Sequence, residues 1–316
     1  MAQASDYTID NSTGANVRAD INTVLQAIAT NNSGSSAPST TFASGFFANT
    51  STSMMQLRNT SNNAFVNLFT LAGGPAFPID GTINSINIGK GANSATGNTV
   101  LGESALDASV SGTGNTAIGN NALTTLTSGQ NNTAVGRFAL SALTTASNNV
   151  AMGNSALGVN ETGASNVAVG VSCLDANTSG ASNVAMGHHA LGANTTASNN
   201  TAIGNASLQL NTTGSSNTAI GANSLDANTV GINNTAVGNS ALGAATEANN
   251  NTAVGAESLD AVTTGGDNTA IGKGALTSLS TGTQNQCMGV NAGVNLTTGG
   301  LNTAIGAFAL GTCVSG

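Results

Sequence analysis

The chain has 316 residues, of which 6% are charged and 3% aromatic, and its formal net charge at pH 7 is −8. Because it holds five Lys and Arg residues in all, it lacks the clustered positive charge needed to bind nucleic acids or anionic membrane surfaces. No run of about 20 apolar residues occurs, so no membrane-spanning segment is predicted. An aromatic-rich globular core is excluded as well.

The N-terminal region predicts one amphipathic helix. Residues 1–10 have neither a basic region nor an apolar core, so no signal peptide is expected. A single apolar stripe with helical spacing follows. A lone helix of about four turns is marginal in water, so we expect it to dock on a partner or on copies of itself. We assign its stripe to attachment: Val17, Ile21, Val24, Leu25 and Ile28.

Two further segments precede the main part of the chain. Residues 31–41 form a linker rich in Ser, Gly and Asn. Residues 42–83 hold a small antiparallel β unit and a joint, with strands predicted at 44–48, 54–59 and 65–71. The sequence therefore predicts three parts: an attachment segment (1–41), the β unit (42–83) and a repeat region (84–316).

The segment 1–71 resembles the N-terminal modules of bacteriophage tail-fibre proteins, notably those of marine phages. The stretches that carry the resemblance are DYTIDNSTGANVRADINTVLQAIATNNSG and FFANTSTSMMQLRNTSNNAFVNL. In that family a short helix and a small strand unit precede a variable fibre body. The resemblance implies that this part of the chain attaches a fibre to a virion.

From residue 98 onward the chain is built from one strictly repeated motif, and a glycine recurs at every seventeenth position. An asparagine stands four residues before each repeat glycine, and a leucine stands four residues after it in 12 of the 13 copies, with Gly293 as the exception. A strict short period is typical of solenoids. The repeat glycines are Gly102, Gly119, Gly136, Gly153, Gly170, Gly187, Gly204, Gly221, Gly238, Gly255, Gly272, Gly289 and Gly306.

Seventeen residues suit one turn of a β-solenoid with two short strands and two tight corners. Residues 116–118 and 121–124 are the predicted strands of one turn, with Gly119 making the bend between them. Stacked at about 4.8 Å, thirteen turns give a rod of about 60 Å. Equivalent asparagines would then form a ladder of side-chain amides along the rod. This ladder includes Asn115, Asn132, Asn149, Asn166, Asn183 and Asn200.

The bulky apolar residues of the repeat predict an oligomer. Consecutive residues of a strand point to opposite faces, so the small alanines can fill the inside while the larger residues form an outer stripe. Such a stripe needs a partner. The predicted packing residues are Ile118, Leu123, Val135, Leu140, Met152, Leu157, Ile203, Leu208, Ile271 and Leu276.

The repeat Asn-Thr-Ala-Ile-Gly followed by Ala-Leu resembles the left-handed parallel β-roll of trimeric autotransporter adhesin heads, the YadA-like head. The resemblance covers residues 84–316. It implies a mainly β, homotrimeric fold in which three rolls pack around a threefold axis. The repeat of this chain is longer than the commonest turn of that family.

No cluster of side chains predicts chemistry. His188 and His189 follow a repeat glycine in one copy only and lack a third ligand, so we interpret them as surface turn residues. Cys173 and Cys287 replace small column residues and behave as small buried hydrophobes, whereas Cys313 stays a candidate for an exposed thiol.

Other charged positions have equally simple interpretations. The Gly-Lys-Gly triplets around Lys90 and Lys273 lack the spacing of a phosphate-binding loop. A column of aspartates follows the leucines; it leaves a weak cation site open, although solvated carboxylates are the simpler interpretation. We therefore expect no enzymatic activity, no cofactor and no metal. The column comprises Asp107, Asp175, Asp226 and Asp260.

These features favour a structural virion protein: a homotrimeric phage tail fibre or spike involved in host-cell attachment. Its expected partners are other tail proteins at the N-terminus and a host receptor, reached directly or through a protein at the C-terminal end. The last repeat would leave a strand edge that we expect a partner or an intertwined trimer end to cover.

Three alternatives remain. A bacterial trimeric adhesin head is disfavoured by the predicted absence of a signal peptide. An ice-binding solenoid would use the threonine column, which Val167 and Val184 interrupt. A polysaccharide lyase ranks last because the repeat lacks clustered acids, bases and aromatic residues.

Overall fold

The computed structural model describes residues 33–34, 46–49, 54–58, 65–70, 81–83, 86–90 and 95–315. The chain divides into two compact units, Met1–Gly81 and Thr82–Gly316. All regular elements of the described residues are strands. The predicted attachment helix, with its stripe from Val17 to Ile28, lies outside them.

The first unit contains a four-stranded sheet in the order β1-β2-β3-β4. Its strands are β1 (Ser33–Gly34), β2 (Phe46–Asn49), β3 (Met54–Arg58) and β4 (Phe65–Thr70). Strands β2, β3 and β4 pair antiparallel, with a register shift between Met55 and Gln56, while β1 runs parallel to β2. The three strands predicted for this region are therefore confirmed.

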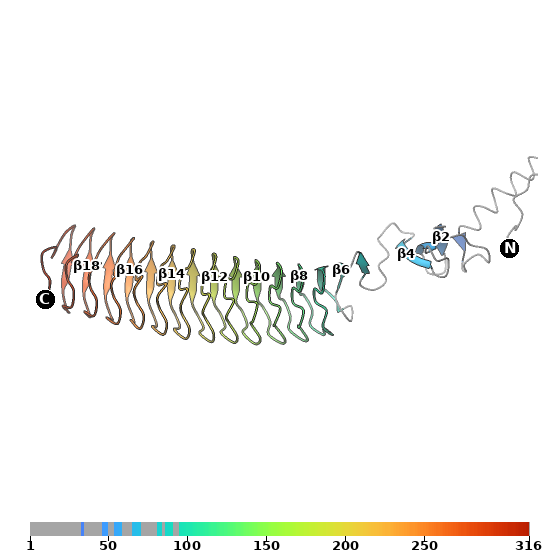
Figure 1. The fold of residues 1–316 in the computed structure, drawn as a ribbon, viewed down its shortest axis with the longest axis horizontal. Coiled ribbons are helices and arrows are strands. Elements are labelled where there is room, and N and C mark those ends of the chain that lie inside the picture. The colour runs from blue at the N-terminus through green and yellow to red at the C-terminus, as the bar shows by residue number, and fades with distance from the viewer. Residues whose placement is uncertain are drawn as a thin grey trace, which may run out of the picture. The chain divides into compact units, whose positions relative to one another are not determined.

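The second unit is a parallel β-solenoid whose strands stack in one row (Figure 1). Its sheet has 15 strands, beginning with β5 (Gly81–Ile83), β6 (Ile86–Gly89) and β7 (Thr99–Gly102). Strand β6 pairs antiparallel with β7, so the first parallel rung of the roll is that of β7. From β7 to β19 each strand is parallel to the next, and each residue pairs with its equivalent in the following repeat, as Thr116 does with Thr133.

Strands β8 to β19 each have three residues. They are β8 (Thr116–Ile118), β9 (Thr133–Val135), β10 (Val150–Met152), β11 (Val167–Val169), β12 (Val184–Met186), β13 (Thr201–Ile203), β14 (Thr218–Ile220), β15 (Thr235–Val237), β16 (Thr252–Val254), β17 (Thr269–Ile271), β18 (Gln286–Met288) and β19 (Thr303–Ile305).

A repeat glycine stands at the C-terminal end of each strand, where the backbone disfavours a side chain. The φ angles of the repeat glycines lie between +120° and +155°, a region that L-residues rarely adopt. A Cβ at Gly187 would also lie 2.3 Å from the carbonyl oxygen of Gly204 in the next rung. Backbone conformation and rung stacking therefore both require glycine at this position.

The predicted second strand of each turn is wrong. Residues 121–124 form turns instead, and both Asn121 (φ 57°) and Leu123 (φ 52°) are left-handed. Since side chains do not alternate in such a turn, Ala122 and Leu123 are both completely buried. Each rung thus has one strand, and the rest of it is built from turns.

The core of the roll runs along the inside of the rungs. It contains the central residue of each strand, which is alanine except for Val100 and Cys287, and the leucine four residues after the glycine, such as Leu123. The leucines were expected on the outside. The structure corrects this, because the following leucines are all 0% exposed within one chain: Leu123, Leu140, Leu157, Leu208 and Leu276.

The asparagine ladder predicted from the sequence is confirmed. The backbone N–H of Asn132 donates to Oδ1 of Asn115 at 2.9 Å, and the Nδ2 of Asn132 donates to Oδ1 of Asn115 at 3.1 Å and to Ala146 O at 3.0 Å. The equivalent backbone-to-Oδ1 bond recurs from Asn115 to Asn302. Because these side chains are buried, each bond satisfies a polar group that water cannot reach.

Candidate interaction surface

The strands β7 to β19 present two columns of side chains outward, which we call the outer sheet face. It consists of the first and third residue of each strand, since the second residue points into the core. The first column is Thr99, Thr116, Thr133, Val150, Val167, Val184, Thr201, Thr218, Thr235, Thr252, Thr269, Gln286 and Thr303. The third-residue column is Leu101, Ile118, Val135, Met152, Val169, Met186, Ile203, Ile220, Val237, Val254, Ile271, Met288 and Ile305.

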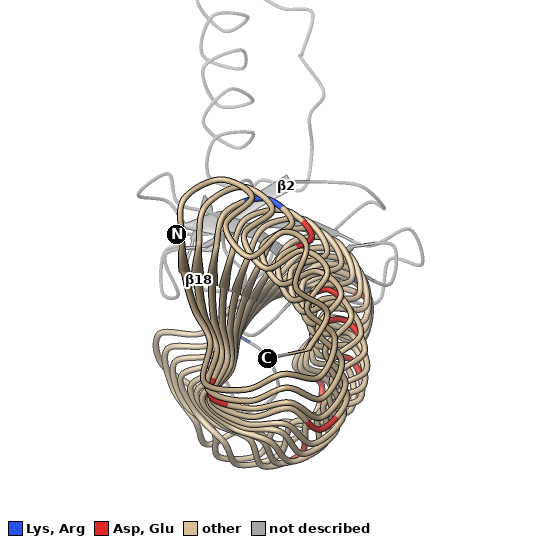
Figure 2. Ribbon diagram, turned by 90° about the vertical axis from the view of Figure 1, so that its left-hand side faces the viewer, with Lys and Arg blue, Asp and Glu red and all other residues tan. Residues whose placement is uncertain are grey.

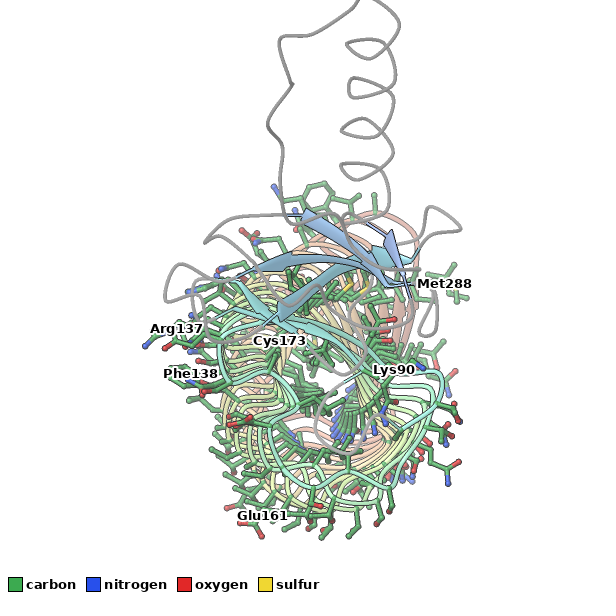
Figure 3. The ribbon with its side chains drawn as sticks, turned by 90° about the vertical axis from the view of Figure 1, so that its right-hand side faces the viewer. Lys90, Arg137, Phe138, Glu161, Cys173 and Met288 are labelled. Atoms are coloured by element: carbon green, nitrogen blue, oxygen red, sulfur yellow. The ribbon has the colours of Figure 1, made fainter. Side chains whose placement is uncertain are left out.

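The apolar column of this face is substantially exposed. Met152 is 44% exposed, Ile203 36% and Met288 47%, and Met288 projects away from the roll (Figure 3). Five of the residues predicted to pack between chains share this face: Ile118, Val135, Met152, Ile203 and Ile271. The five predicted leucines do not, because they lie inside the roll.

The outer sheet face carries no charge in any of its 13 strands. The acidic residues of the roll lie on the looping parts of the rungs, and the strands carry none (Figure 2). Between Arg137 and Lys273 the chain has seven acidic residues and no Lys or Arg. The roll therefore has an uncharged strand side and an acidic turn side.

Two carboxylates of the aspartate column approach each other on the turn side. Gly243 lies between Asp226 and Asp260, and a Cβ there would meet Oδ1 of Asp260 at 2.6 Å and Oδ1 of Asp226 at 3.7 Å. Burial, and then the charge of Asp260, raise the pKa of Asp226. Burial, and then the charge of Glu257, raise the pKa of Asp260. Within residues 95–315 and the other described segments, no group of three or more His, Cys, Asp or Glu side chains could hold a metal ion.

The remaining candidate residues belong to the turns. His188 is exposed and its ring makes an edge contact with that of His189, the ring centroids being 4.0 Å apart. The guanidinium of Arg137 lies 4.3 Å from the ring centroid of Phe138 (Figure 3). Gly274, next to Lys273, has a φ of +65° and takes the left-handed turn position that Asn291 takes in the next rung.

The burial predicted for Cys173 and Cys287 is confirmed. Cys173 and Cys287 are buried, and Cys313 is of intermediate exposure. Burial raises the pKa of the Cys173 thiol to about 12, and burial also raises the pKa of Cys287. These two thiols are small core residues and not nucleophiles.

The structure contains a second column of asparagines that was not predicted from the sequence. Its members stand seven residues after the repeat glycine, are completely buried, and bond from Nδ2 to Oδ1 along the rungs. An Asn three residues before a Gly or Ala in five consecutive copies was the signal that could have revealed it. We call it the second asparagine column: Asn160, Asn177, Asn194, Asn211 and Asn228.

Among the described residues, no helix has both the length and the apolar character needed to cross a bilayer. No protein-family model, no curated protein and no solved structure matches the chain.

Proposed function

We propose that this chain is a structural subunit of a fibre or spike in which identical chains pack through the outer sheet face. The observation that carries the proposal is the contrast between the two sides of the roll: the strand side is uncharged and exposes its apolar column, while the acidic groups are on the turns. The outer sheet face is about 58 Å long at the usual strand spacing. A contiguous apolar strip of this kind is typical of an interaction site.

The burial of the leucines within one chain places the proposed interface on the strand side of the roll. Since Leu123 and its equivalents already pack within one chain, the outer sheet face is the surface that self-association would bury. A homotrimer around a threefold axis is the arrangement implied by the resemblance of the repeat to trimeric adhesin heads. In such a trimer three Ile/Val/Met columns would meet along the axis and lose their contact with water.

We further propose that the assembly is a phage tail fibre, located in the virion and involved in host attachment. This part rests on the resemblance of residues 1–71 to tail-fibre N-terminal modules. The N-terminal segment would bind other tail proteins, and the stiff stack of rungs would hold the opposite end away from the virion. Cosedimentation of the full chain with a panel of intact bacterial cells tests attachment; no binding to any cell would leave only the structural role.

The interface is tested by placing charge on the outer sheet face. Ile203→Lys combined with Ile220→Lys should convert the assembly to monomers, because buried lysines facing one another across an interface are strongly unfavourable. Leu210→Lys is the matched control, since Leu210 is 51% exposed but lies outside the outer sheet face. Circular dichroism checks that both variants keep the β fold. An unchanged oligomer in the double variant would contradict the proposal.

A second candidate function, ice binding, is favoured by one observation. Thr201, Thr218, Thr235, Thr252 and Thr269 lie side by side on five adjacent strands of the same face. Thermal hysteresis of the full chain decides between the candidates: freezing-point depression that is lost in Thr235→Lys would favour ice binding over a fibre.

A further inference from the structure

The second asparagine column ends inside the core, at a position where the next residue in line is an alanine. Asn228 is its last member, and Ala245 occupies the equivalent position of the following rung. Both residues are completely buried. The end of the column is therefore a polar group facing an apolar residue within the roll.

From Asn177 onward each amide nitrogen of the column bridges two acceptors. The Nδ2 of Asn211 donates to Oδ1 of Asn194 at 3.0 Å and to Gly214 O at 2.9 Å. The Nδ2 of Asn228 likewise donates to Oδ1 of Asn211 at 2.7 Å and to Gly231 O at 3.1 Å. The pattern is one donor nitrogen held between a side-chain oxygen and a backbone oxygen.

In the rung of Ala245 the two equivalent acceptor oxygens are present, but alanine has no side-chain N–H to bridge them. Oδ1 of Asn228 is the one buried side-chain oxygen or nitrogen of the described residues that has no hydrogen-bond partner. The second acceptor is Ala248 O, to which Asn234 Nδ2 donates at 2.6 Å. One rung earlier, the equivalent Gly231 O accepts from both Asn217 and Asn228.

The two acceptors lie at nearly the same distances from the neighbouring glycine as in the complete rungs. A Cβ built on Gly231 would lie 2.3 Å from Ala248 O and 2.4 Å from Asn228 Oδ1, so these oxygens are no more than about 4.7 Å apart. The same point at Gly214 lies 2.3 Å from Gly231 O and 2.5 Å from Asn211 Oδ1, with the bridging Asn228 Nδ2 at 2.8 Å. The geometry that receives a donor is thus repeated where the donor is missing.

The backbones of the neighbouring rungs cannot move together to fill the space beside Ala245. Thr229 N donates to Thr246 O at 2.9 Å, and Thr246 N donates to Thr263 O at 3.1 Å, so the backbone spacing on both sides of Ala245 is fixed by hydrogen bonds. Flipping the Asn228 amide, so that its oxygen and nitrogen exchange places, would not help. Its oxygen would then face Asn211 Oδ1 and Gly231 O, two acceptors with no hydrogen to share.

We propose that one water molecule binds at the end of the second asparagine column, donating one hydrogen to Asn228 Oδ1 and the other to Ala248 O. A water has one heavy atom and fits where Ala245 lacks the three heavy atoms of a carboxamide. It supplies two O–H donors to two converging acceptors, as Nδ2 does in the other rungs. A cation such as ammonium is disfavoured because the site is buried and its acceptors are neutral.

A crystal structure of the full chain at atomic resolution tests this site directly. The expected result is an isolated electron-density peak within hydrogen-bond distance of both Asn228 Oδ1 and Ala248 O. No peak, or a direct protein donor to Asn228 Oδ1, would overturn the proposal.

Substitution of Ala245 gives an independent test. Ala245→Asn should place its Nδ2 where the water binds, abolish the density peak and raise the midpoint of thermal unfolding. Ala244→Asn is the control, because that residue is only partly buried and its new amide would reach solvent. A peak that persists unchanged in folded Ala245→Asn would contradict the assignment.

Discussion

The Oδ1 atom of Asn166 accepts the backbone N–H of Asn183 at 2.9 Å and its side-chain Nδ2 at 3.2 Å. The side-chain oxygen of one asparagine therefore accepts two hydrogen bonds from the next rung. The side-chain oxygen of Asn183 likewise accepts the backbone N–H of Asn200. Because these amides are completely buried, the repeat can lose none of them without leaving polar groups unpaired.

Removing one rung of the ladder should destabilise the roll. Asn183→Ala deletes the acceptor of Asn200 N and the donor to Ala197 O, and we expect a loss of about 2–4 kcal/mol in the free energy of unfolding. Asn199→Ser is the control, because Asn199 is exposed and Ser216 takes the same position in the next rung. Denaturant titration of both variants measures the difference; equal midpoints would contradict a structural role for the ladder.

The repeat glycine Gly187 should be irreplaceable, unlike Gly192 of the same rung. Gly187→Ala forces a side chain into positive φ and against Gly204 O, which should cost about 4 kcal/mol or more. Gly192→Ala should be tolerated, since its nearest new contact is 3.3 Å away, at His189 O. Soluble yield and thermal unfolding distinguish the two variants. A stable, well-folded Gly187→Ala would show that the rungs are less tightly stacked.

The two apolar columns should respond differently to truncation. Leu208→Ala opens a cavity in the core and should cost about 2–5 kcal/mol whatever the oligomeric state. Ile203→Ala, on the outer sheet face of the same rung, should cost about 1 kcal/mol in an isolated chain but weaken self-association strongly. Unfolding and sedimentation experiments on both variants separate core from interface. Comparable effects on association would contradict this division.

The carboxylates beside Gly243 should make stability depend on pH. Because the pKa of Asp260 is raised in the folded chain, its ionisation opposes folding, and stability should fall as pH rises from the usual Asp pKa to the raised one. Asp260→Asn should therefore raise the unfolding midpoint at pH 7 and have little effect at acidic pH, where the carboxyl is protonated. Glu247→Gln, elsewhere on the turn side, is the control. A stabilisation that persists unchanged at low pH would contradict the electrostatic explanation.

The thiols should differ in reactivity. With its pKa raised to about 12, Cys173 stays protonated at pH 8 in the folded chain. We expect iodoacetamide to modify Cys313 first and to reach Cys173 and Cys287 only after denaturation, as peptide mass spectrometry can show. The raised thiol pKa also predicts that stability declines above about pH 9, where the unfolded thiol ionises first. Rapid modification of Cys173 without unfolding would contradict its place in the core.

The strict period alone predicted the solenoid, the alanine core and the first asparagine ladder, because each depends on one residue type recurring without a slip. The leucines could not be placed in the same way. Leu123 lies inside because it and Asn121 are left-handed, a conformation that only glycine and asparagine signal reliably in a sequence. The second asparagine column occupies five rungs and gives way to apolar residues in others, as at Leu126 and Leu143, so its pattern is local. The residues of the outer sheet face can be predicted once the strands are known, because side chains alternate along a strand. The number of chains that pack through this face cannot be predicted in that way.

The absolute mass of the purified full-length chain, from light scattering after size exclusion, tests the central claim most directly. Packing of three chains through the outer sheet face predicts a mass near 92 kDa, three times the 30.5 kDa of one chain. The double variant Ile203→Lys and Ile220→Lys should then elute as a folded monomer. A native chain that remains at 30.5 kDa over the whole concentration range would contradict the account, since its apolar column would face water.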